Sequence, residues 1–189
     1  MKTKNVSPYR WVILFTTIPV IIATEMMWLT FSPISSIAET FYGTSSMAVT
    51  MLATSYMLMF IVFCVPAAYV IDRFGFRASL WIGALLTGIF GLTRGLFAET
   101  FTLVMISQFL IAAGQPFLLN ITTKVAANWF PFDERATAAG ILTMAQYLGF
   151  ALPMVLSPML SEQYGLPGML KLFAAVGVIA SLFPGKNNG

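Results

Sequence analysis

The sequence contains no histidine and a single cysteine, Cys64, among its 189 residues. One cysteine excludes a disulfide within the chain, and the lack of histidine removes the usual partners of cysteine in a zinc site. The acidic residues are scattered, and only Asp133 and Glu134 are neighbours. We therefore expect neither a metal enzyme nor a hydrolase, and we expect no cofactor.

Charge is also scarce, because only 9% of the residues are charged, whereas soluble domains have about 25%. Apolar residues make up 58% of the chain, the mean hydropathy is +0.84, and long apolar runs recur along the whole length. Strands of a membrane barrel would alternate apolar and polar residues over about ten positions. The longer, continuous runs predict an all-α membrane protein. The net charge of +3 does not indicate nucleic-acid binding, because the basic residues lie in loops.

Six apolar stretches are long enough to cross a bilayer. The predicted spans cover residues 11–36, 46–71, 78–98, 101–127, 136–160 and 166–184. The connections between them are short, so we expect one transmembrane bundle over residues 1–189 rather than two domains.

The distribution of lysine and arginine predicts the orientation, because cytoplasmic loops are enriched in these residues. If the N terminus is cytoplasmic, only Arg94 and Lys171 fall on the opposite side. The basic residues on the cytoplasmic side are then Lys2, Lys4, Arg10, Arg73, Arg77, Lys124, Arg135 and Lys186. We expect both termini in the cytoplasm, an integral protein of the cell (inner) membrane, and no cleavable signal peptide at residues 1–30.

The connection between the second and third predicted spans carries a motif, Asp72-Arg73-x-Gly75-x-Arg77. It resembles the cytoplasmic signature of the major facilitator superfamily, Gly-x-x-x-Asp-Arg/Lys-x-Gly-Arg-Arg/Lys, with Ala68 and Phe76 as departures. The resemblance implies one half of a major-facilitator fold, built as an inverted three-plus-three repeat. It also implies that Asp72, Arg73, Gly75 and Arg77 form a conformational latch. The alternative is an ordinary charged turn.

Further segments, in the same order and spacing, resemble the feline leukaemia virus subgroup C receptor family. They are Glu39-Thr40-Phe41-Tyr42-Gly43, Ala113-Gly114-Gln115-Pro116-Phe117 and Lys124-Val125-Ala126-Ala127-Asn128-Trp129-Phe130. The resemblance covers most of residues 10–160. That family transports choline and ethanolamine and has been linked to haem export. It implies that Trp28 and Gln115 line a central cavity. It also implies twelve spans, of which this chain has six, so an aromatic residue from a second half is missing.

Glu25 departs from that family, in which its position is apolar. A carboxylate in the middle of a span is costly to bury, and it usually marks a substrate or proton path. Trp28 lies on the same helical face, so the two side chains predict a place for a cation. The candidate substrate-binding residues are Glu25, Trp28, Gln115, Gln146 and Tyr147.

Each candidate also has a simpler interpretation. Glu25 can be a protonated hydrogen-bonding group between helices, Trp28 a packing residue, and the glutamines contacts between helices. Gln108 and Gln115 share one stripe of the fourth span. Arg94 lies near the outer end of the third span, so we expect it to extend toward the membrane surface, outside the site.

The predicted function is transport of a small organic solute by alternating access, with a cationic or zwitterionic amine such as choline or ethanolamine as substrate. Haem is disfavoured because histidine, its commonest axial ligand, is absent. The alternatives are a proton-coupled carrier with Glu25 as relay, and a non-transporting six-helix membrane subunit. Besides the lipid bilayer, we expect as partner either a second copy or a separate C-terminal half.

Overall fold

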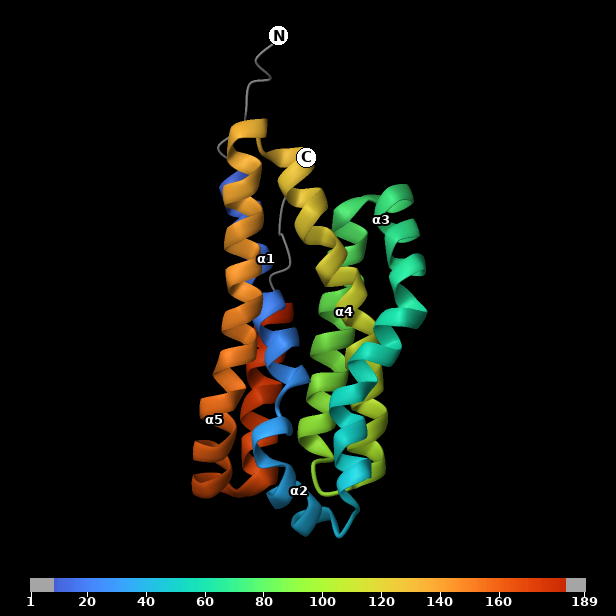
Figure 1. The fold of residues 1–189 in the computed structure, drawn as a ribbon, viewed down its shortest axis with the longest axis vertical. Coiled ribbons are helices and arrows are strands. Elements are labelled where there is room, and N and C mark those ends of the chain that lie inside the picture. Colours follow the sequence, from blue (N-terminus) through green and yellow to red (C-terminus); the bar gives the residue numbers. More distant parts are fainter. Residues whose placement is uncertain (1–8, 183–189) are drawn as a thin grey trace.

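The computed structural model describes residues 9–182, and their regular structure is entirely helical (Figure 1). The elements are α1 (Tyr9–Trp28), a short 3-10 turn η1 (Ser32–Ile34), α2 (Ser35–Tyr42), α3 (Ser46–Leu96), α4 (Phe101–Trp129) and α5 (Phe132–Ser181). The end of the last predicted span and the basic residues Lys2, Lys4 and Lys186 lie outside the described residues.

Four helical stretches of the described part are long and apolar enough to cross a bilayer. They are Arg10–Tyr42, Ser46–Leu96, Phe101–Trp129 and Phe132–Ser181. The helical class and the membrane character predicted from the sequence are therefore confirmed.

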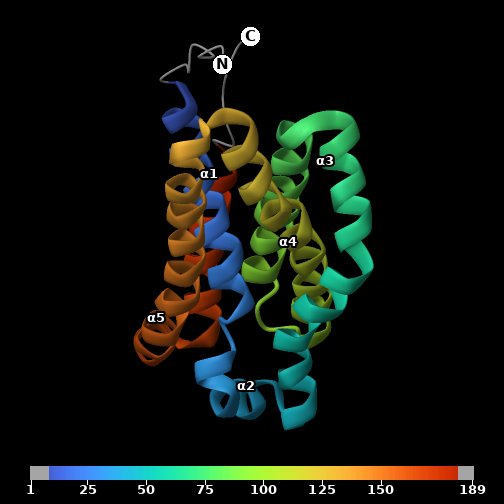
Figure 2. The ribbon, with the colours of Figure 1, turned by 45° about the horizontal axis from the view of Figure 1, so that its top comes forward.

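Two of these helices are too long to be single spans. At 1.5 Å per residue, the 51 residues of α3 would measure about 75 Å, against a hydrocarbon core of about 30 Å. The helical conformation is broken at Gly75 in α3 (φ 84°, ψ 170°) and at Gly165 in α5 (φ 69°, ψ 170°). Only glycine adopts this backbone region readily. Each helix folds back on itself, α3 at one end of the bundle and α5 at the other (Figure 1, Figure 2).

The first predicted span is not one continuous helix. The helix α1 ends at Trp28, and η1 and α2 follow after a turn. Pro33, the second residue of η1, explains the break, because proline has no N–H and its ring clashes with the carbonyl four residues earlier. The hydroxyl of Thr30 donates to the carbonyl oxygens of Met26 (2.9 Å) and Met27 (3.2 Å) at the end of the helix.

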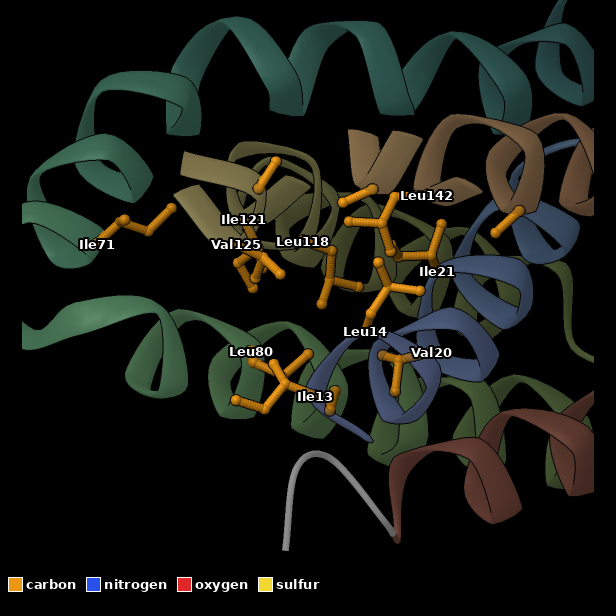
Figure 3. Close-up of a cluster of buried hydrophobic side chains, with 14 of the residues drawn as sticks. Ile13, Leu14, Val20, Ile21, Ile71, Leu80, Leu118, Ile121, Val125 and Leu142 are labelled. Atoms are coloured by element: carbon orange, nitrogen blue, oxygen red, sulfur yellow. The ribbon is translucent and has the colours of Figure 1, made fainter. Parts of the chain in front are cut away.

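The bundle is held together by two large apolar clusters. Figure 3 shows the first, in which α1 side chains such as Leu14 meet Leu80, Ile121 and Leu142 from α3, α4 and α5. The second gathers Met26, the η1–α2 region and the C-terminal part of α5. Along α1 the first cluster ends at Ile21 and the second begins at Met26. Glu25 therefore lies at the boundary between two apolar cores.

Candidate functional site

Glu25 is buried inside the bundle and is 1% exposed. The side-chain amide of Gln115, from α4, donates to its Oε2 at 3.0 Å. The amide of Gln146, from α5, donates to its Oε1 at 3.4 Å. Both oxygens of one carboxylate are thus bound by amides from two other helices.

No basic residue balances the charge of Glu25 within the part of the chain that the structure describes. The ion pairs there join Arg10 to Glu134 and Lys124 to Asp72. A buried carboxylate without a countercharge attracts any cation that reaches it, and this includes a proton.

Gly149 determines how closely α5 approaches α1 beside this carboxylate. A Cβ atom at that position would lie 2.7 Å from the Cβ of Glu25 and 2.9 Å from the carbonyl oxygen of Ile22. Real Cβ atoms do not approach other atoms this closely, so only glycine fits. Gln146 lies about one turn before Gly149, and this close contact brings its amide within reach of Glu25.

Trp28 belongs to a row of aromatic rings. Its indole stacks on Tyr56 of α3, with ring centroids 5.4 Å apart and planes inclined by 8°. It also meets Phe150 of α5 edge to face at 5.5 Å, and Phe150 in turn contacts Tyr147 at 6.0 Å. The indole nitrogen donates to the carbonyl oxygen of Ala53 at 2.9 Å. Trp28 is therefore held by an edge hydrogen bond and by rings from two other helices.

The structure places the five candidate residues at different depths. Glu25 and Gln115 are buried, Trp28 and Gln146 are half-buried, and Tyr147 is 65% exposed. Tyr147 contacts the ring of Phe150, which in turn contacts Trp28. Sequence reasoning missed Tyr56 and Phe150. Phe150 lies four residues after Gln146, on the same helical face, and this spacing was the available signal.

Asp72 is the residue of the predicted latch that pairs with another helix. Asp72 pairs with Lys124 of α4 at 2.6 Å. Arg73 instead donates to the hydroxyl of Tyr69 at 2.8 Å, and the guanidinium of Arg77 lies 6.0 Å from the ring centre of Phe76. The carboxylate thus bridges the fold of α3 to the end of α4, while the two arginines contact aromatic rings of their own helix.

The expectation for Arg94 was wrong. Its side chain does not extend to the membrane surface; it is 0% exposed and lies inside the bundle. Its guanidinium donates to the carbonyl oxygen of Met27 (3.0 Å) and to Oε1 of Gln108 (2.6 Å). Gln108 is therefore engaged with Arg94, not with Glu25, although it shares a stripe of α4 with Gln115. Hydrogen-bond acceptors inside the bundle made burial possible, and these are invisible in the sequence.

Comparison with known proteins identifies relatives of the chain. It is 28% identical over 185 residues to the choline/ethanolamine transporter FLVCR2 of Rattus norvegicus, covering 94% of this chain and 34% of the relative. It is 29% identical over 156 residues to the choline/ethanolamine transporter FLVCR1 of Felis catus, covering 82% and 28%. An uncharacterized MFS-type transporter of Caenorhabditis elegans is 32% identical over 153 residues, covering 80% and 26%.

The chain thus spans about a third of the length of these relatives or less. The resemblance predicted from the motifs is confirmed by these names. The family pattern of the Major Facilitator Superfamily matches residues 7–186, nearly the whole chain. The chain therefore belongs to the Major Facilitator Superfamily, a family of membrane transporters and not of enzymes.

Proposed function

We propose that this chain is the N-terminal half of an alternating-access transporter for a small cationic or zwitterionic amine, such as choline or ethanolamine. The observation that carries the proposal is the buried carboxylate of Glu25, which is bound by two amides and has no basic partner among residues 9–182. The row of aromatic rings that includes Trp28 supports it, as do relatives named as choline/ethanolamine transporters.

The chemistry of an ammonium group matches these two features. A quaternary or primary ammonium on an indole face gains about 0.5–2 kcal/mol from cation–π attraction. Tyr56 stacks on one face of the Trp28 ring and Phe150 packs against the ring at nearly a right angle, so these two residues limit where an ammonium group can reach the indole. Glu25, three residues earlier on α1, supplies the complementary charge, although desolvation of the carboxylate offsets much of this gain.

The proposed half has six spans. The breaks at Gly75 and Gly165 support this number, because each divides a helix of 51 or 50 residues into two parts. Three spans then precede and three follow the turn before α4, as an inverted repeat requires. Alternating access needs a second bundle, supplied by another copy of the chain or by a separate C-terminal half.

A second candidate function is a proton-coupled carrier in which Glu25 is the relay. The observation in its favour is the 1% exposure of Glu25. A carboxylate this deeply buried favours a proton over an ammonium group as its ligand, because a proton needs far less space beside the amides of Gln115 and Gln146.

The variant Glu25→Gln separates the two functions. Choline binding is measured by calorimetry on the assembled transporter in nanodiscs at two pH values, and uptake is measured after the same assembly is placed in proteoliposomes. The exposed acid Glu162 provides the control variant Glu162→Gln. Amine recognition predicts affinity lower by about 10- to 150-fold at both pH values, since a charge-assisted contact contributes about 1.5–3 kcal/mol.

The proton relay predicts a different result for the same variant. Choline affinity then stays at the level of the unmodified chain, while the pH dependence of uptake disappears. Unchanged affinity together with an unchanged pH profile would contradict both functions, and Glu25 would then be a structural contact between helices.

A further inference from the structure

The guanidinium of Arg94 is the most deeply buried cation in the described part of the chain, and no carboxylate pairs with it there. Its polar contacts are Met27 O at 3.0 Å, Gln108 Oε1 at 2.6 Å and Thr30 Oγ1 at 3.4 Å. The ring of Phe31 lies 5.8 Å from its central carbon. Burying a guanidinium without a countercharge is costly, so its acceptors must supply compensating negative charge.

The C-terminal end of α1 supplies this negative charge. The last four carbonyl groups of a helix have no partner within it, and together they carry about half a negative charge. Because α1 stops at Trp28, the carbonyl of Met27 is one of these groups. Arg94 donates to it from α3, and Nε2 of Gln108 donates to it from α4 at 3.2 Å. Arg94 is thus the positive charge at a negative helix terminus, which explains the absence of a carboxylate.

The same two side chains hold both backbone segments that surround Trp28. Met27 directly precedes Trp28 on α1. Gln108 Nε2 also donates to the carbonyl oxygen of Leu52 at 3.2 Å, and Leu52 directly precedes Ala53, whose carbonyl accepts the indole N–H of Trp28 at 2.9 Å. One amide group therefore connects the segment that carries the indole to the segment that binds it.

We propose that Arg94 and Gln108 are positioning residues for the indole of Trp28. They fix the ring by tying the end of α1 to the α3 segment that accepts its N–H. The consequence for substrate affinity rests on the function proposed above, but the position of the ring does not. If Arg94 and Gln108 only stabilised the end of α1, conservative changes at these two positions would leave the environment of the indole unchanged.

The variant Gln108→Glu isolates this role. A carboxylate at this position keeps an acceptor for Arg94 and adds an ion pair, but it loses the donations to Met27 and Leu52. Arg94→Lys is the second variant, since it keeps the charge at the helix end and loses the forked geometry. The control is Ser79→Ala, which removes a buried bond from α3 to α4, Ser79 Oγ to Phe117 O at 2.7 Å, away from Trp28.

The measurement uses the full chain in nanodiscs with Trp28 as the single tryptophan, after Trp11→Phe, Trp81→Phe and Trp129→Phe. Emission wavelength, acrylamide quenching and melting temperature are recorded, followed by the choline affinity of the assembled transporter. We expect red-shifted emission and stronger quenching in Gln108→Glu and in Arg94→Lys, and unchanged emission and quenching in Ser79→Ala. Choline affinity should fall by about tenfold in the first two variants, equivalent to about 1.4 kcal/mol.

The proposal is overturned if either folded variant keeps the emission and quenching of the parent while only its melting temperature falls. It stands, and the amine-transport function fails, if the ring environment changes but the assembled transporter with unmodified Trp28, Arg94 and Gln108 does not bind choline.

Discussion

At the scale of single residues, the indole of Trp28 is held both by ring stacking and by a hydrogen bond. One face rests on Tyr56, which is fully buried, and the N–H is bound to a backbone carbonyl. These contacts hold the ring in place, and a side chain that is already fixed loses little conformational entropy when a ligand binds. Phe150 and Tyr147 extend the aromatic surface toward the exposed side of α5.

Replacing the indole of Trp28 should lower the affinity for a cationic amine, by an amount that depends on the side chain that replaces it. We expect Trp28→Ala to weaken choline binding by about 2- to 30-fold, which corresponds to the loss of about 0.5–2 kcal/mol. Trp28→Phe should weaken it less, because a benzene ring keeps a smaller quadrupole. Calorimetry on the assembled transporter in nanodiscs measures both variants. Trp11→Ala, at the other end of α1, is the control, and equal affinities in all four proteins would contradict the role of Trp28.

At the scale of elements, the fold of α3 is the point where two helices are joined by charge. Asp72 lies just before the break at Gly75 and binds Lys124 near the end of α4. Both side chains are largely exposed, at 63% and 44%. Exposed pairs contribute about 0–1 kcal/mol to stability, so this pair is suited to opening and closing during a transport cycle rather than to holding the fold.

We therefore expect Asp72→Asn to slow transport much more than it lowers the melting temperature. Lys124→Gln should have the same effect, because either change removes the pair. The double exchange Asp72→Lys with Lys124→Asp should restore part of the rate. Uptake rates and melting temperatures of the assembled transporter test this. Normal turnover at normal expression in the single variants would show that the pair is not a latch.

At the scale of the whole molecule, the apolar surface is unevenly covered. The helix α4 is mostly buried, while the first part of α3 and the middle of α5 expose large apolar side chains, among them Ile61, Val65, Tyr147 and Val155. In a bilayer such surfaces face lipid or another bundle. The residues of the candidate site on α5 lie beside one of these exposed surfaces.

One bundle presents only one side of a midplane site, and alternating access moves one bundle against another. We therefore expect no uptake from a strictly monomeric preparation of this chain. Uptake should appear when a covalently linked dimer or a co-expressed C-terminal half is present. Cross-linking followed by liposome uptake measures both states. Robust transport by verified monomers would refute the half-transporter proposal.

Much of the architecture follows from the sequence alone. Scarce charge and long apolar runs predict membrane helices, because apolar stretches of this length are more stable in lipid than in water. The motif around Asp72 and the segments around Glu39, Gln115 and Lys124 predicted the family. The role proposed for Glu25 rests on a signal that the sequence contains, one ionisable side chain inside an apolar stretch. Local spacing, however, did not predict that α1 ends at Trp28 rather than continuing to residue 36.

The contacts that make up the site were decided by the tertiary structure. Gln115 and Gln146 reach Glu25 across 90 and 121 positions of sequence, and Lys124 rather than an arginine meets Asp72. Arg94 is buried because two separate segments supply its acceptors, namely the end of α1 with the following Thr30, and Gln108 of α4. Side-chain chemistry states what each group needs. Only the packing of the helices determines which distant group satisfies it, since that depends on close approaches such as Gly149 against Glu25.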